Sequence, residues 1–247
     1  AQAEEQCKDL WTRFGFSCDW SLLYTTIDPW VQRISQRSFL DLVRRNRVYR
    51  RESPTLWCPE CGTAVAQAET EDREFQGFFH DLRFPLSDGS GSIPIATTRP
   101  ELLPACVGVF VNPEDPRFSG LKGARVRVPL FDREVVVRTD PAVDMEKGSG
   151  AVMCCTFGDT TDIQWWQDYD LELRIVLDSR GHMNEKAGFL AGMFWRKARQ
   201  VLVDRLREEG FARGGREIVH TVNTHERCGT PLEYLVNKQW FIRVLDI

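Results

Sequence analysis

The sequence lacks any long hydrophobic run, which excludes a chain that crosses a membrane as a helix. No stretch of its 247 residues approaches the roughly 18 uninterrupted apolar residues that such a span needs. The first residues, Ala1 to Gln6, are also too polar for the apolar part of a signal peptide. We therefore expect no membrane partner and, by default, a cytoplasmic location.

The chain begins without Met, which we expect of a fragment or a processed product.

The chain also lacks a surplus of positive charge. It carries 32 Lys and Arg against 36 Asp and Glu, a formal net charge of -4. Phosphate neutralisation supplies most nonspecific affinity for nucleic acids, so a tight nonspecific binder normally shows a basic excess. Any contact with RNA must therefore be local. Basic clusters at residues 44–51 and 196–207 are candidates, although such runs more often form the solvated face of a helix.

The size of the chain argues against a fold that depends on disulfides. It has 8 cysteines, but it is far longer than the small secreted scaffolds that rely on them. Hydrophobic residues make up 42% of the sequence and charged residues 28%, which is ordinary for a globular protein with a sizeable core. Cys154 and Cys155 lie in an apolar stretch, and Cys7, Cys18 and Cys106 are isolated. We expect all of these cysteines to pack in the core.

Helices are predicted at the start of the chain and at two later places. Residues up to about 57 look helical, and Asp28 followed by Pro29 is a good helix start, with an end near Asn46. A capping-box pattern of Thr161 with Gln164 predicts a helix that runs to about Tyr169. A third helix is expected from Gly192 to Glu209, because apolar residues recur on one face and Gly210 follows.

Between these helices the sequence favours β structure. Turn-rich residues 87–92 separate two apolar runs and predict a β-hairpin. The expected strands cover residues 82–86, 93–98, 107–111, 124–130, 134–138 and 151–156, and short extended pieces are expected over 218–241. Short strands separated by Gly, Pro and Asp turns indicate a barrel or a sandwich rather than a βαβ sheet.

Two polar segments could face each other across a pocket. Thr97, Thr98 and Arg99 lie where a predicted strand meets Pro100, and they offer two hydroxyls and a fork of N–H donors. Asp159 and Asp162 lie three residues apart at a predicted helix start, where the helix dipole favours the ionised carboxylate. Such a carboxylate could bind a cationic group of a small ligand.

Each of these residues also has an ordinary explanation. Asp159 could simply cap the helix, and Asp162 could be a first-turn acid favoured by the macrodipole. The two threonines could be plain strand residues, because threonine favours strands. The combination of segments is what argues for a site.

Three segments in order carry a resemblance to a known family. Thr97-Thr98-Arg99-Pro100-Glu101, Gly148-Ser149-Gly150-Ala151-Val152 and Gly158-Asp159-Thr160-Thr161-Asp162 resemble the editing pocket of class I aminoacyl-tRNA synthetases for valine, isoleucine and leucine. The resemblance implies an enzyme that hydrolyses a wrongly attached amino acid from the 3′-terminal adenosine of a transfer RNA. Water would attack the ester carbonyl without a protein nucleophile, and the chain has no G-x-S-x-G elbow.

The resemblance also implies roles for single residues. Asp162 would hold the α-amino group, and Thr97 and Thr98 would position the substrate and the attacking water. The expected substrate-binding residues are Arg99, Glu101, Leu102, Met153, Thr156 and Asp159. Among them, Thr156 and Asp159, together with Asp162, are candidates for recognition of the substrate hydroxyl.

The chain departs from the usual family pattern at three positions. Leu102 stands where many relatives have a third threonine, and Gly158 replaces the His of the usual His-Asp-x-x-Asp. Met153 stands where bacterial valine enzymes commonly have Lys and isoleucine enzymes His, while leucine enzymes commonly have Met. These departures put in doubt which residue recognises the substrate side chain.

Among the three specificities, valine fits best. Thr156 to Trp166, Thr97 to Cys106 and Asp19-Trp20-Ser21 are similar to the archaeal-type valyl enzymes, and the resemblance covers nearly the whole chain. The alternatives are an editing domain of a leucyl or isoleucyl enzyme, or a noncatalytic module that docks transfer RNA or serves as a zinc scaffold.

A separate constellation predicts a metal site. Cys58-x-x-Cys61 and His225-x-x-Cys228 share one spacing, and each pair is followed by Gly. Three cysteines and one histidine form a standard closed zinc site, so the expected ion is a structural Zn²⁺. The alternatives are reduced thiols without metal, or a redox dithiol.

The class I signatures His-Ile-Gly-His and Lys-Met-Ser-Lys-Ser are absent, so the chain cannot activate an amino acid with ATP by itself. ATP would serve only the synthetic domain of a parent enzyme, and the remainder of that parent chain is an expected partner.

We expect a helical segment at 1–57, zinc-ribbon arms at 58–81 and 216–247, and an editing domain at 82–215. The predicted fold class is α+β: a β-barrel-like editing core with surrounding helices, a helical N-terminal segment and a small zinc-ribbon-like linker.

Overall fold

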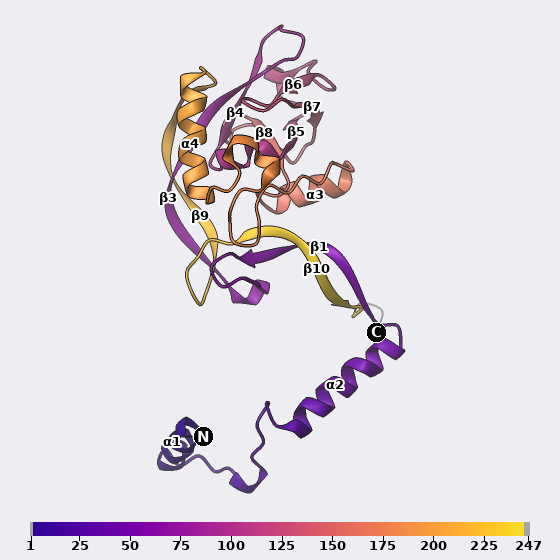
Figure 1. Cartoon of the computed structure of the whole chain (residues 1–247), viewed down its shortest axis with the longest axis vertical. Helices are drawn as coiled ribbons and strands as arrows, with labels where there is room; N and C mark the ends of the chain where they lie inside the picture. The colour runs from indigo at the N-terminus through magenta and orange to yellow at the C-terminus, as the bar shows by residue number, and fades with distance from the viewer. Residues whose placement is uncertain (1, 245–247) are drawn as a thin grey trace. The chain divides into compact units, whose positions relative to one another are not determined.

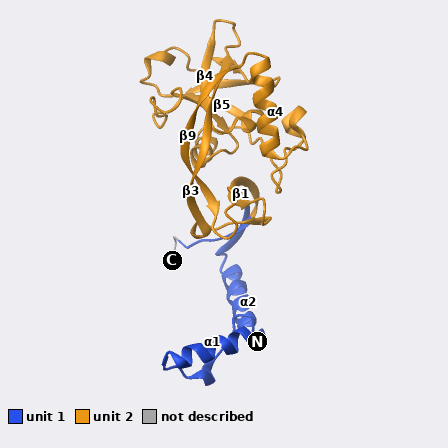
Figure 2. Ribbon diagram, turned by 90° about the vertical axis from the view of Figure 1, so that its left-hand side faces the viewer, with its two compact units in different colours: residues 1–51, 239–247 blue, residues 52–238 orange. Residues whose placement is uncertain are grey.

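The computed structural model of the chain describes residues 2–244 and is a mixed α+β structure (Figure 1). It divides into two units, one made of residues 1–51 and 239–247 and the other of residues 52–238 (Figure 2). Within residues 2–244, no helix has the length and apolar character needed to cross a membrane.

The first unit contains α1 (Gln2–Arg13), a 3-10 turn η1 (Trp20–Leu22) and α2 (Pro29–Arg44). The predicted start of α2 is confirmed, with Asp28 at the N-cap and Pro29 in the first turn. The helix ends at Arg44, two positions before the expected Asn46, whose φ of 55° is left-handed. None of the described residues of α1 or α2 is buried.

This exposure makes two of the cysteine predictions wrong. Cys7 and Cys18 are exposed, because they lie in a unit whose helices bury no side chains, whereas Cys106, Cys154 and Cys155 are buried as expected.

The prediction that the first 57 residues are helical is wrong for the last part of this range. β1 (Val48–Cys58) is a strand that pairs with β2 (Thr63–Ala64) and β10 (Glu233–Ile242) in a sheet of order β10-β1-β2. Pairing between distant strands overrides the local pattern there.

A second sheet, of order β4-β3-β9, is built on a long strand pair. A short η2 (Gln67–Glu69) leads into β3 (Thr70–Pro85), which pairs antiparallel with β4 (Ser92–Thr97) and β9 (Ala212–His225). The hairpin of β3 and β4 is confirmed. The short pieces expected after residue 218 are instead long strands, because β3 begins well before residue 82 and supplies a partner from Thr70 onward. β3 and β9 curve side by side along one flank (Figure 1).

The third sheet has the order β6-β7-β5-β8. Its strands are β5 (Cys106–Val111), β6 (Arg125–Arg127), β7 (Glu134–Thr139) and β8 (Ala151–Cys155). β5 is parallel to β7 and antiparallel to β8, and a 3-10 turn η4 (Pro116–Phe118) follows β5.

The expected barrel is wrong, because the sheets of the described chain stay open. β4 and β8 each end their sheet, and no ladder joins them. A single bridge, Leu86 with Val126, connects the hairpin of β3 and β4 to β6. Pro94 lies on β4, and a proline without an N–H suits an edge strand rather than a closed ladder.

Two helices pack on the sheets of the second unit. α4 (Trp195–Glu208) buries Ala198, Leu202, Val203 and Leu206, and it begins three residues after the expected Gly192. α3 (Thr160–Asp168) is capped by Asp159, so the predicted Thr161 capping box is wrong. The α3 side chain of Trp165 stacks on Phe110 with ring centroids 4.2 Å apart, which fastens the helix to β5.

Truncation of the buried face of α4 should destabilise the second unit. Leu206 is fully buried in the core, and Leu206→Ala is expected to lower the free energy of unfolding by about 2–5 kcal/mol. Arg207→Ala removes only an exposed pair with Asp204 on the same helix and should cost less than about 1 kcal/mol. Urea unfolding of both variants measures the difference, and equal losses would contradict the packing of α4.

Candidate functional site

Residues 97–102, called the threonine segment below, lie where β4 runs into a buried turn. Thr97 is the last residue of β4 and is 8% exposed, and its Oγ1 accepts a hydrogen bond from the backbone N–H of Arg99 at 3.0 Å. Thr98 is half-buried. The 3-10 turn η3 (Pro100–Ala105) then begins, and all its residues are buried. The backbone of this segment is therefore tightly held.

The Gly-Ser-Gly segment lies directly against that strand. Ser149 Oγ accepts a hydrogen bond from the N–H of Ala96 at 3.2 Å and donates to the carbonyl of Ala151 at 3.0 Å. Gly148 has a φ of +63°, and a Cβ there would lie 3.1 Å from Cβ of Ala96. Glycine is needed for this conformation and this approach. The residue just before the first motif segment is thus bonded directly to the second segment.

Asp162 lies in the first turn of α3 and is 6% exposed. Its Oδ2 accepts a hydrogen bond from the N–H of Gly158 at 2.8 Å, and its Oδ1 accepts one from Cys155 at 3.3 Å. Asp159 caps the helix by accepting from the N–H of Asp162 at 2.9 Å. The ordinary role predicted for Asp159 is therefore confirmed.

Gly158 explains how the carboxylate of Asp162 can lie so close to the loop. A Cβ at this position would lie 2.8 Å from Oδ2 of Asp162 and 3.5 Å from Cδ1 of Leu102. Leu102 of the threonine segment and Asp162 of the third segment therefore meet around Gly158. The third motif segment is thereby brought to the first.

The ionisation of Asp162 differs from the expectation. Burial raises its pKa to about 7, the nearby Asp159 carboxylate adds to the rise, and hydrogen bonds from Gly158 and Cys155 oppose it. The helix dipole was expected to favour the ionised form, and burial outweighs it. A cationic partner at this carboxylate would lower the pKa again.

Thr156 and Met153 lie on or beside β8. Thr156 is 3% exposed, and its hydroxyl donates to the carbonyl of Arg174 at 2.8 Å and accepts from the Arg174 N–H at 2.9 Å. One acceptor position of this hydroxyl remains after these two bonds. Met153 is 8% exposed and is paired with Val109 of β5.

A narrow cavity adjoins these residues. Its volume is about 10 Å³, about the room that one water molecule needs. Its lining consists of Leu102, Thr156, Phe157, Ile175, Val176, Leu177, Tyr234 and Leu235. Two predicted site residues, Leu102 and Thr156, therefore share one lining, whereas Thr97, Thr98, Asp159 and Asp162 lie outside it. Tyr234 of β10 was missed by sequence reasoning, since no motif includes it.

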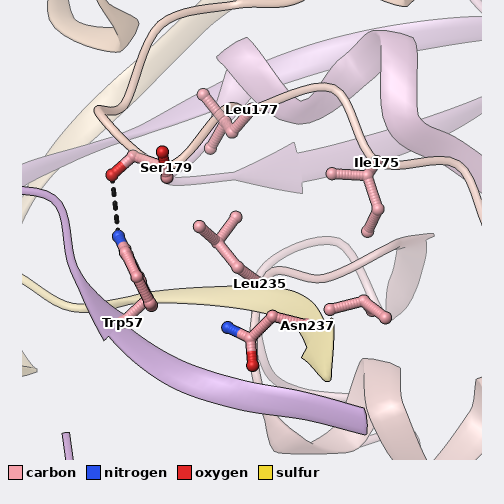
Figure 3. A pocket seen from close by; sticks show the side chains of 7 residues that line it. Trp57, Ile175, Leu177, Ser179, Leu235 and Asn237 are labelled. Carbon is pink, nitrogen blue, oxygen red and sulfur yellow. Dashed lines mark hydrogen bonds between the residues drawn. The ribbon is translucent and has the colours of Figure 1, made fainter. Parts of the chain in front are cut away.

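Figure 3 shows the residues that line a larger cavity of about 190 Å³. The two cavities share Ile175, Leu177 and Leu235. Trp57 lines the larger cavity, and its indole N–H donates to the carbonyl of Ser179 at 2.7 Å. The walls are mostly apolar, and the cavity widens the space next to the motif residues.

Arg99 and Glu101 face protein groups. Glu101 is fully buried and accepts two hydrogen bonds from Arg199 of α4, at 2.7 and 2.8 Å, and one from Arg99 at 3.1 Å. Arg99 also donates to Glu233 of β10 at 2.6 Å. Burial, the largest single effect, opposes ionisation of Glu101, but the hydrogen bonds and charges of Arg199 and Arg99 together outweigh it and hold its pKa below the usual range. The expected contact of Arg99 and Glu101 with substrate stays a prediction.

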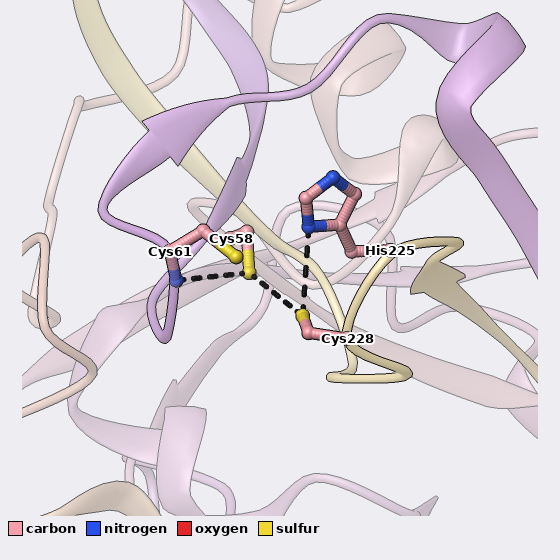
Figure 4. Close-up of side chains that lie close together, drawn as sticks. All are labelled: Cys58, Cys61, His225 and Cys228. Carbon is pink, nitrogen blue, oxygen red and sulfur yellow. Dashed lines mark hydrogen bonds between the residues drawn. The ribbon is translucent and has the colours of Figure 1, made fainter. Parts of the chain in front are cut away.

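The four expected metal ligands converge in space (Figure 4). Cys58 and Cys61 lie at the turn between β1 and β2, while His225 ends β9 and Cys228 follows it. All four ligand atoms lie within 4.8 Å of one another. The Sγ atoms of Cys58 and Cys228 are 3.5 Å apart, as are Cys228 Sγ and His225 Nδ1. Ligands of a tetrahedral zinc ion with bonds near 2.3 Å lie roughly 3.8 Å apart, so the donor set and spacing fit that ion.

Comparison with known proteins gives one family. The family model described as "tRNA synthetases class I (I, L, M and V)" matches residues 1–247. The chain is 47% identical to a valine--tRNA ligase of Haloarcula marismortui over 98% of its own length and 29% of that protein. It is 45% identical to the valine--tRNA ligase of Pyrococcus horikoshii, covering 100% of this chain and 28% of that one.

Similarity extends beyond the archaea. The valine--tRNA ligase of Rickettsia conorii is 44% identical over 98% of this chain and 30% of its own length. The chain thus spans less than a third of these curated relatives. A crystal structure of a ternary complex of LeuRS from Agrobacterium radiobacter K84 overlaps with a TM-score of 0.45 and 18% identity, covering 89% of this chain and 36% of that one.

The raised pKa of Asp162 predicts how stability should change with pH. Below about pH 3.8 the carboxyl is protonated in both the folded and the unfolded chain, so it adds no difference. Between that value and about 7 the unfolded chain ionises first, so the wild type should lose stability relative to Asp162→Asn, by up to about 4 kcal/mol. Above pH 8 the carboxyl is ionised in both states, so the difference in the free energy of unfolding between the two proteins should stay constant.

Urea unfolding of the wild type and of Asp162→Asn from pH 4 to 9 tests this expectation. Subtracting the free energy of unfolding of one protein from that of the other cancels the contributions of all other titrating groups, which the two proteins share. A difference that stays flat between pH 4 and 7 would show that burial does not raise the pKa of Asp162.

Proposed function

The chain belongs to the class I tRNA synthetases of the isoleucine, leucine, methionine and valine group, and from this premise we propose that it is the editing region of a valine-specific enzyme. Its proposed reaction is the hydrolysis of threonine from a transfer RNA that should carry valine. The observation that carries the proposal is the approach of the three motif segments: Ala96, just before the first, is bonded to Ser149 of the second, and Leu102, just after the first, lies beside Gly158 and Asp162 of the third. Residues 82–215 form the proposed editing domain.

The valine assignment is supported by the relatives. Identities of 44% to 47% over nearly the whole chain are to proteins named valine--tRNA ligase. Editing is needed for this specificity on physical grounds. A valine pocket rejects isosteric threonine only about 100-fold, or less than roughly 3 kcal/mol. A polar second pocket can accept threonine through its hydroxyl and exclude valine, which would leave polar groups unpaired.

In the proposed mechanism Asp162 binds the α-ammonium group of the misattached amino acid. The ammonium favours the ionised carboxylate and so opposes the effect of burial on its pKa. Water attacks the ester carbonyl, and Thr97 and Thr98 position the water and the terminal adenosine. Catalysis rests on this positioning, because no protein nucleophile takes part.

Recognition of the substrate side chain falls to the remaining motif residues. Leu102 and Met153 supply apolar walls, and the acceptor position that remains on Thr156 can receive the threonine hydroxyl. Asp159 caps α3 and adds negative charge beside Asp162. Arg99 and Glu101 shape the threonine segment.

A noncatalytic module that docks transfer RNA or scaffolds zinc is a second candidate. The observation in its favour is the narrow cavity beside Leu102 and Thr156, whose volume is only about 10 Å³. An editing site must therefore admit the aminoacyl adenosine along the larger cavity that adjoins it.

We also propose that Cys58, Cys61, His225 and Cys228 hold a structural zinc ion. When bound, the ion would supply folding stability by clamping the turn after β1 to the turn after β9. Four protein ligands leave no open position for a reacting water, so the site takes no part in hydrolysis. Within the parent enzyme the partners would be transfer RNA and the rest of the polypeptide, where ATP would be used.

Removal of the Asp162 carboxylate should abolish editing. Asp162→Ala is expected to slow hydrolysis of threonyl-tRNA for valine by at least about 100-fold, since the α-ammonium group loses its partner. Asp168→Ala, at the other end of α3, is the matched control and should keep the wild-type rate. Release of labelled threonine measures both.

Three results of this assay would count against parts of the proposal. Full activity in Asp162→Ala would remove Asp162 from the mechanism. Equal cleavage of leucyl substrates by the wild type would favour leucine specificity, and no hydrolysis by the wild type would favour the noncatalytic module.

Protein purified without chelator should contain about one zinc ion per chain, as measured by elemental analysis. Cys228→Ser should lower this content and the thermal stability together, because one ligand is lost. Cys18→Ser changes an exposed cysteine outside the cluster and should alter neither. Less than about half a zinc ion per chain in the wild type would count heavily against the site.

A further inference from the structure

A network of alternating charges, in which two buried carboxylates bind two partly exposed arginines, ties the threonine segment to two distant elements. We propose that Arg199 and Glu233 are positioning residues for the editing reaction, which act through Arg99 and Glu101 to hold the segment from Thr97 to Leu102. This inference rests on the proposed function and adds to it two residues that lie in none of the motifs.

The network runs in one line through four side chains. Arg199 of α4 binds Glu101 with both Nε, at 2.7 Å, and Nη2, at 2.8 Å. Glu101 also accepts from Nε of Arg99 at 3.1 Å, and Nη2 of Arg99 reaches Glu233 of β10 at 2.6 Å. The Glu101 side chain is fully buried and that of Glu233 is 6% exposed. Two cations and two anions therefore alternate, so no charge in the line lacks an opposite neighbour.

The two bonds of Arg99 fix its orientation. Nε and Nη2 of one planar guanidinium bind different carboxylates, one from η3 and one from β10. A planar fork held at two points cannot rotate without losing a bond. An apolar side chain of similar size could fill the space, but it would not set a direction.

The position of Arg99 directly affects the position of the proposed catalytic residues. The backbone N–H of Arg99 donates to Oγ1 of Thr97 at 3.0 Å, so the position of residue 99 sets the threonine hydroxyl. On the other side of Pro100, Glu101 is anchored to α4, and its neighbour Leu102 lines the narrow cavity. Both ends of the turn are thereby held by charges that come from other elements.

The energetics favour a role in specifying geometry over a role in stability alone. Buried ion pairs lose much of their attraction to desolvation, and apolar replacements of similar volume are often as stable. Their well-supported use is to select one arrangement among several. Here the selected arrangement is that of the segment expected to position water and substrate.

Glu233→Gln tests the inference with little change in shape, because glutamine keeps an acceptor oxygen but loses the charge. Amide hydrogen exchange followed by NMR should show the Arg99 N–H exchanging about tenfold faster or more, while amides of the β5 and β8 ladder stay unchanged. Glu134→Gln is the control, since it weakens exposed ion pairs with Arg125 and Arg127 on β6 and β7, away from the threonine segment. Unchanged exchange at Arg99 in Glu233→Gln would overturn the inference.

Kinetics supply the second readout. Glu233→Gln and Arg199→Gln should each lower kcat for threonyl-tRNA hydrolysis about tenfold or more and leave KM within about twofold, because they misplace groups without removing a substrate contact. Glu134→Gln should leave both constants unchanged. An unchanged kcat in a folded Glu233→Gln protein would overturn the inference.

A double-variant cycle separates positioning from a general loss of folding. If Glu233 acts through the hydroxyl of Thr97, Glu233→Gln combined with Thr97→Ala should be no more than about twofold slower than Thr97→Ala alone. Additive effects would overturn the inference. If the wild type does not hydrolyse the ester, the proposed function is wrong. The hydrogen-exchange experiment then still tests whether the network holds the threonine segment in place.

Discussion

The carboxylate of Asp162 occupies the space where a side chain at position 158 would stand, and the candidate pocket depends on this arrangement. Gly158 and Cys155 donate their N–H groups to the two carboxylate oxygens, so the loop between β8 and α3 closes around one acid. The same closure brings Leu102 against the loop from the other side. Because the acid is buried, its charge is costly unless a cation arrives. A site of this kind suits an ammonium ligand.

Side-chain bonds, rather than a closed barrel, hold the motif segments together. β4 and β8 are edge strands, and Ala96 of β4 is bonded to Ser149, which lies two residues before β8. The arginine and glutamate line from Arg199 to Glu233 then holds the turn that follows β4.

Local signals in the sequence were reliable where the residues involved are near neighbours. Asp28 with Pro29 marks the start of α2, and the turn-rich residues between β3 and β4 mark their hairpin. The paired Cys-x-x-Cys and His-x-x-Cys spacings led to four ligand atoms that do converge. Predictions failed where a distant partner decided the outcome. β1 was expected to be helical, because nothing in its own sequence indicates that it pairs with β10. β9 was expected as short pieces, because only the apolar end of β3, from residue 82, was recognised as a strand that could pair with it.

The sequence by itself determined the family, the order of the motif segments and the types of groups that could bind an aminoacyl ester. Only the tertiary structure decided what those groups face. Arg99 and Glu101 were expected to contact substrate, yet their charged ends meet residues 134 and 98 positions away. The helix start suggested an ionised Asp162, yet burial raises its pKa to about 7. Both outcomes depend on which distant atoms exclude water from a charge, and such long-range neighbours leave no periodicity or spacing in the chain.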